Sequence, residues 1–155
     1  MGKGAVYSGK NVVQTQSYGA EARGSAAKSD VIISDGKIGF PGVRKCDILV
    51  TMSQTALNKN LGDLKEEGIL LIDICTVKNI PEIKAKVIRI SATETAKEAF
   101  GASIYANMIV LGTLTKLINK VNKKAMEKAI RESVPQKTVE ANIIAFRKGL
   151  YFVTC

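Results

Sequence analysis

The feature that most constrains the fold is a set of three short, almost uninterrupted apolar runs in the middle of the chain. They are D-I-L-V-T-M at Asp47–Met52, I-L-L-I-D-I at Ile69–Ile74 and K-V-I-R-I at Lys86–Ile90. Strands with one face in water alternate apolar and polar residues, whereas strands buried on both faces of a parallel sheet read as continuous apolar runs. The runs therefore predict a largely parallel sheet that is covered on both faces.

Helix signals separate these runs. Ser53 is placed to cap a helix over Gln54–Leu61, because a serine oxygen accepts a hydrogen bond from a free N–H at a helix start. Ser91 stands in the same relation to a helix over Ala92–Phe100, with Glu94 at the position that completes a capping box. Buried strands that alternate with short helices are typical of α/β proteins.

The N-terminal part contains two further predicted strands, Asn11–Gln16 and Ser29–Asp35. Between them, Ser17–Lys28 is rich in Gly, Ala and Ser and has no apolar periodicity, so we expect mostly loop. Asp35-Gly36 is a strong hairpin-turn dipeptide, which predicts that Lys37–Phe40 pairs back antiparallel.

The C-terminal third is predicted to be helical over Ser103–Ile118, Asn122–Ser133 and Thr138–Lys148, with Gly149 ending the last helix. The first of these helices is apolar nearly all round, which indicates burial in the core or against another chain. We therefore expect one domain over residues 1–155, with a Rossmann-like three-layer α/β fold, a largely parallel sheet and a helical C-terminal third.

The chain is basic, with 23 Lys and Arg against 14 Asp and Glu and a formal charge of +9. A nucleic-acid-binding module is one reading of that charge, but the basic residues are dispersed and aromatic residues make up only 5%. The helical third carries a run of basic residues that reads as a solvated face; docking of an acidic partner or of ligand phosphates is the alternative. These residues are Lys116, Lys120, Lys123, Lys124, Lys128 and Arg131.

Three widely spaced cysteines (Cys46, Cys75 and Cys155) and the absence of histidine restrict the chemistry. The cysteines form neither a disulfide framework nor a C-x-x-C pair, so we expect no metal site in this chain. Nucleophilic arrangements that need histidine are excluded, and no catalytic residue is predicted. No apolar run is long enough for a membrane span and no signal peptide is evident, so the prediction is cytoplasmic, with no membrane partner.

The segment S-Y-G-A-E-A-R-G-S at Ser17–Ser25 resembles the S-Y-G-[PA]-E-x-R-G-G motif of the gamma subunits of 2-oxoacid:ferredoxin oxidoreductases. Further matching segments extend the resemblance from about residue 5 to residue 147. They are S-D-V-I-I-S-D at Ser29–Asp35, Phe40-Pro41, D-I-L-V at Asp47–Val50, Asn107-Met108 and Leu111-Gly112. The Glu-Ala-Arg version followed by V-I-I-S-D is more similar to the 2-oxoglutarate branch than to the pyruvate branch.

The resemblance implies a subunit that is inactive alone. Enzymes of this family convert a 2-oxoacid and coenzyme A to acyl-CoA and carbon dioxide, and pass electrons to ferredoxin. Thiamine diphosphate and iron–sulfur clusters carry out that chemistry in partner subunits, and coenzyme A is the co-substrate. The implied partners are alpha and beta subunits, a delta subunit as a further candidate, and ferredoxin through the complex. A non-catalytic nucleotide-, coenzyme A- or nucleic-acid-binding module remains the alternative.

The resemblance also selects candidate site residues. They are Tyr18, Gly19, Glu21, Arg23, Gly24 and Asn107. One interpretation is a tight loop that packs against a neighbouring subunit, with Glu21 and Arg23 paired. The other is that Arg23 and the N–H groups of the loop meet a phosphate or the acyl-CoA end. Asn107 lies on an apolar helix, and the favoured interpretation is a structural amide that would need a hydrogen-bond partner if buried.

Two departures from the family pattern stand out. The family's initial strand and G-x-G-G-Q-G loop are absent, and Gly2–Gly9 resembles the end of the helix that follows that loop. A missing central strand is expected to leave sheet edges and apolar surface uncovered. The second departure is Ser25, which stands where the family usually has glycine.

Overall fold

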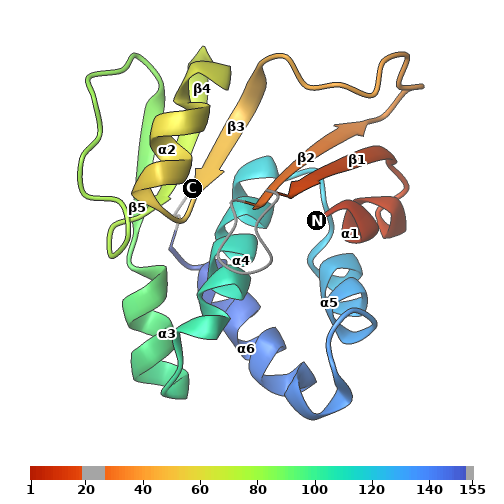
Figure 1. Cartoon of the computed structure of the whole chain (residues 1–155). Coiled ribbons are helices and arrows are strands. Elements are labelled where there is room, and N and C mark those ends of the chain that lie inside the picture. Colours follow the sequence, from red (N-terminus) through yellow and green to blue (C-terminus); the bar gives the residue numbers. More distant parts are fainter. Residues whose placement is uncertain (19–26, 153–155) are drawn as a thin grey trace.

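The computed structural model describes residues 1–18 and 27–152, which form two sheets and a group of helices (Figure 1). The larger sheet is parallel, in the order β3 (Cys46–Thr51), β4 (Leu64–Asp73), β5 (Lys86–Ile90). The smaller sheet pairs β1 (Asn11–Tyr18) with β2 (Ala27–Ser34) in antiparallel fashion. The predicted α/β class and the parallel sheet are confirmed.

The middle strand β4 shows why the apolar runs have no polar alternation. Leu70 and Ile72 face one core cluster with Leu57 of α2 (Gln54–Asn60), while Leu71 faces a second cluster on the opposite side with Ile109. Successive strand residues point to opposite faces, so a strand between two apolar layers needs apolar residues at every position. The predicted start of this strand at Ile69 was too late, since β4 begins at Leu64.

The two predicted helix caps fared differently. Ser53 caps α2 as predicted, with the Ala56 N–H donating to the Ser53 Oγ at 3.1 Å. Ser91 precedes α3 (Ala92–Phe100), but its side chain makes no cap hydrogen bond there, so the Ser91–Glu94 capping box is wrong. The buried carboxylate of Asp73 takes that place, because it accepts from the Thr93 N–H at 2.9 Å.

The predicted hairpin at Asp35-Gly36 is also wrong. Strand β2 pairs with β1, from Asn11 opposite Ser34 to Tyr18 opposite Ala27, and residues 37–40 are not a strand. The turn residues instead bind the start of β1, where Asn11 Nδ2 donates to the Gly36 carbonyl at 3.1 Å. The predicted loop over 17–28 contributes both of its described ends to the strands.

The remaining helices are α1 (Gly2–Tyr7), α4 (Ala106–Ile118), α5 (Lys123–Arg131) and α6 (Val139–Gly149). Three single 3-10 turns precede or join helices and strands, at Leu61–Asp63, Ser103–Tyr105 and Gln136–Thr138. In Figure 1, α4 and α6 cross below the parallel sheet, and α5 lies beside α1 under the small sheet. A third core cluster joins α1, α5 and α6 around Phe146 and Met126.

The crossing of α4 and α6 depends on two glycines. A Cβ on Gly112 would lie 2.0 Å from the Phe146 carbonyl oxygen, and one on Gly149 would lie 1.9 Å from the Ile109 carbonyl oxygen. The Thr113 hydroxyl donates across the same contact to the Gly149 carbonyl at 2.8 Å. Helix α6 ends at Gly149 as predicted, and the same glycine also permits the close packing against α4.

Candidate functional site

The candidate motif begins at the end of β1. Tyr18 is the last residue of that strand, and its backbone pairs with Ala27, the first residue of β2. Gly19, Glu21, Arg23 and Gly24 lie outside the described residues, as does Ser25. Their roles at a ligand or an interface therefore stay predictions.

Asn107, the remaining candidate, is the second residue of α4 and is exposed. Because the amide is exposed, it does not need the hydrogen-bond partner that burial would require. The interpretation of Asn107 as a structural amide stays a prediction. Helix α4 is apolar overall, but it leaves Asn107 near its start and Lys116 near its end in solvent.

A groove of about 1290 Å³ lies between β2 of the small sheet and β3 of the parallel sheet. Among the described strands, β3 pairs only with β4 and β2 only with β1, so each presents an edge without a strand partner. The side chains along the groove are largely apolar and come from both strands and from the last turns of α4. They include Val31, Ile33, Ile48, Val50, Leu114 and Leu117.

Thr51 contributes an unusual polar group to this groove. It closes β3, its side chain is 2% exposed, and its Oγ1 has no hydrogen-bond partner among the described residues. A buried hydroxyl without a partner costs about 1–3 kcal/mol. The sequence offered no signal for it, because a threonine at the end of a buried strand is common.

The polar rim of the groove lies where β2 meets the start of β3. Lys28 Nζ lies 2.9 Å from an Asp63 carboxylate oxygen and 3.8 Å from one of Asp30. The hydrogen bond to Asp63 raises the pKa of Lys28, which keeps this amine protonated. Burial raises the pKa of the neighbouring Cys46 thiol, so Cys46 is a poor nucleophile near neutral pH.

Asp73 is the one fully buried carboxylate that the structure describes, and it lies at the carboxyl end of β4. Such strand ends often carry functional residues in α/β proteins. Here both oxygens are occupied, because one accepts from the Cys75 N–H at 3.0 Å and the other from the N–H and hydroxyl of Thr93. Asp73 therefore fixes the start of α3, and burial raises the pKa of the adjacent Cys75 thiol.

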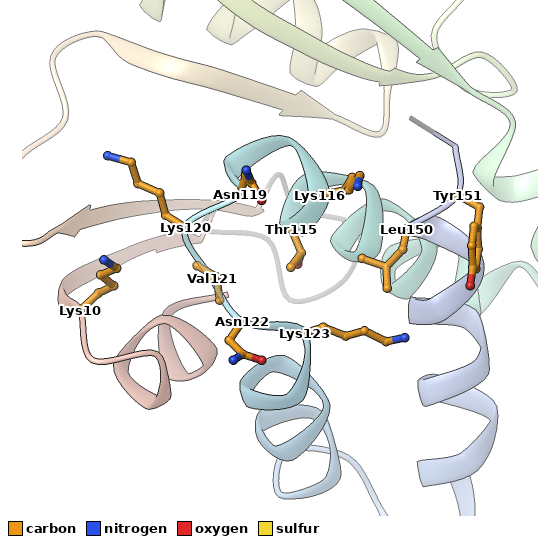
Figure 2. A pocket seen from close by; sticks show the side chains of 10 residues that line it. All are labelled: Lys10, Thr115, Lys116, Asn119, Lys120, Val121, Asn122, Lys123, Leu150 and Tyr151. Carbon is orange, nitrogen blue, oxygen red and sulfur yellow. The ribbon is translucent and has the colours of Figure 1, made fainter. Parts of the chain in front are cut away.

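A second pocket, of about 960 Å³, lies between the C-terminal ends of α4 and α6 and the start of α5 (Figure 2). Lys116, Lys120 and Lys123 line it, together with Lys10 from the turn before β1. Of the basic run that was predicted to be a solvated face, only Lys116, Lys120 and Lys123 border this pocket. Elsewhere in the same run, Lys128 lies over the Tyr7 ring and Arg131 pairs with Glu140 at 2.8 Å.

Within residues 1–18 and 27–152, no group of three or more His, Cys, Asp or Glu side chains is placed to hold a metal ion. The same residues include no helix that is both long and apolar enough to cross a membrane. In the part of the chain that the structure describes, the apolar groove and the lysine-lined pocket are features that can receive a partner or ligand.

Comparison with known proteins gives consistent matches. The family model described as pyruvate ferredoxin/flavodoxin oxidoreductase matches residues 1–152. The 2-oxoglutarate synthase subunit KorC of Methanocaldococcus jannaschii is 49% identical over 94% of this chain and 79% of its own length.

Two solved structures have the same fold. The gamma subunit of a keto/oxoacid ferredoxin oxidoreductase from Geobacter sulfurreducens is 40% identical, with a TM-score of 0.84 over 98% of this chain and 86% of that chain. The pyruvate oxidoreductase subunit PORC of Thermotoga maritima is 28% identical, with a TM-score of 0.75 over 96% of this chain and 83% of that chain.

Proposed function

Because this chain belongs to the pyruvate ferredoxin/flavodoxin oxidoreductase family, we propose that it is the gamma subunit of a 2-oxoacid:ferredoxin oxidoreductase that acts on 2-oxoglutarate. The observation that carries the proposal is the 49% identity to a 2-oxoglutarate synthase subunit over 94% of the chain. Identity to the pyruvate oxidoreductase subunit is only 28% at similar coverage, which favours the 2-oxoglutarate branch.

In this proposal the chain supports a reaction whose cofactors are held elsewhere. A 2-oxoacid and coenzyme A give acyl-CoA, carbon dioxide and reduced ferredoxin. Thiamine diphosphate and iron–sulfur clusters supply the carbanion and electron-transfer chemistry when bound to the partner subunits. The described cysteines of this chain, Cys46 and Cys75, belong to different elements and form no cluster-ligand group. No step is therefore assigned to a metal in this chain.

The chain itself contributes a surface for contact with the other subunits. The groove between β2 and β3 offers apolar side chains, which suit contact with a neighbouring polypeptide. The alpha and beta subunits are the proposed neighbours, and ferredoxin is reached through the complex. We assign residues 1–155 to one gamma-type domain that works in the cytoplasm.

Substrate choice tests this proposal directly. The tagged chain is purified from its host under anaerobic conditions with the proteins that accompany it, and reduction of ferredoxin is followed with coenzyme A present. We expect faster reduction, measured as kcat/KM, with 2-oxoglutarate than with pyruvate. An assembly that prefers pyruvate contradicts the 2-oxoglutarate assignment, and the absence of larger partner subunits contradicts the gamma-subunit assignment.

The role of the Tyr18–Gly24 segment has a separate test. If Arg23 meets a phosphate or the acyl-CoA end, Arg23→Ala raises the KM for coenzyme A in the assembled enzyme while assembly is unchanged. Arg89→Ala is a suitable control, since Arg89 is exposed on β5 and lines neither the groove nor the lysine-lined pocket. Unchanged kinetics with normal assembly would reject a ligand role for Arg23.

A further inference from the structure

We draw no further inference here: the strongest candidate, the apolar groove between the strand edges of β2 and β3, already belongs to the surface proposed for contact with the other subunits, and nothing among the described residues shows which polypeptide covers it.

Discussion

Substitution of Gly112 by alanine should destabilise the chain strongly, because the added methyl group has no space. Its Cβ would lie 2.0 Å from the Phe146 carbonyl oxygen, whereas an ordinary contact begins near 3.4 Å. Helices α4 and α6 would have to separate by more than 1 Å, since the obstructing atoms are backbone and cannot rotate away. That movement would also stretch the bond from the Thr113 hydroxyl to the Gly149 carbonyl.

Overpacking of a core costs about 1–3 kcal/mol, and a clash with backbone belongs at the upper end of that range. We therefore expect Gly112→Ala to lower the free energy of unfolding by about 3 kcal/mol. For a chain of this size that corresponds to a fall in Tm of about 6–12 °C. Circular dichroism during urea and thermal unfolding measures both quantities.

The matched control is Gly62→Ala, which introduces the same methyl group at an exposed glycine with nothing within 4 Å. Its effect should stay within about 1 kcal/mol, because only the conformational entropy of the unfolded chain changes. If Gly112→Ala were as stable as Gly62→Ala, the close crossing of α4 and α6 would be refuted.

Three further predictions concern single polar groups. Thr51→Val should raise the free energy of unfolding by about 1 kcal/mol in denaturant titrations, because a buried hydroxyl without a partner is removed; a loss of stability would show that the hydroxyl is bonded. Asp73→Ala should lower it by about 3 kcal/mol, because buried N–H groups, including that of Thr93, lose their acceptor; a change below about 0.5 kcal/mol would contradict this role. The hydrogen bond from Arg147 lowers the pKa of Glu127. The stabilisation from this pair is therefore complete above the unfolded-state pKa of about 4.3. It disappears as the pH falls through the lower pKa of the folded state. Glu127→Gln should therefore flatten the acid side of the stability–pH curve, and a curve as steep as that of the wild type would count against the pair.

Much of the fold could be predicted from the sequence because the parallel sheet has a strong local signature. Strand β5 and helix α3 have the predicted bounds, and Ser53 caps α2 as expected. Each depends on residues adjacent in sequence: a continuous apolar run, or a serine three residues before the N–H that it accepts from. Local chemistry and tertiary packing agree at these positions.

The wrong predictions share one cause, which is a partner distant in sequence. Ser91 had a suitable local pattern, but Asp73 at the end of β4 accepts the hydrogen bond from the Thr93 N–H at the start of α3. Asp35-Gly36 was suited to a hairpin, but β1 was available as the partner of β2. Gly149 ends α6 as predicted, but its close approach to the backbone of α4 could not be seen in the sequence. Sequence spacing contains no information about these approaches.

The candidate sites, too, could be predicted from the sequence only in part. The motif at Tyr18–Gly24 could be recognised only through the family resemblance, and most of it lies outside the described residues. The run of lysines was visible in the sequence, but the sequence did not show which of them line one pocket. The chain reverses at Asn119 and Lys10 approaches from the N-terminal part, so residues that the helical pattern separates come together. The unbonded Thr51 hydroxyl had no signal at all.

The central claim is that this chain is one part of a larger enzyme and has no redox chemistry of its own. Ferredoxin reduction with 2-oxoglutarate and coenzyme A, measured for the purified chain, for the partner subunits and for the two combined, tests it most directly. The account predicts turnover by the combination and none by this chain alone. Turnover by the isolated chain, or an iron–sulfur spectrum from it, would contradict the account.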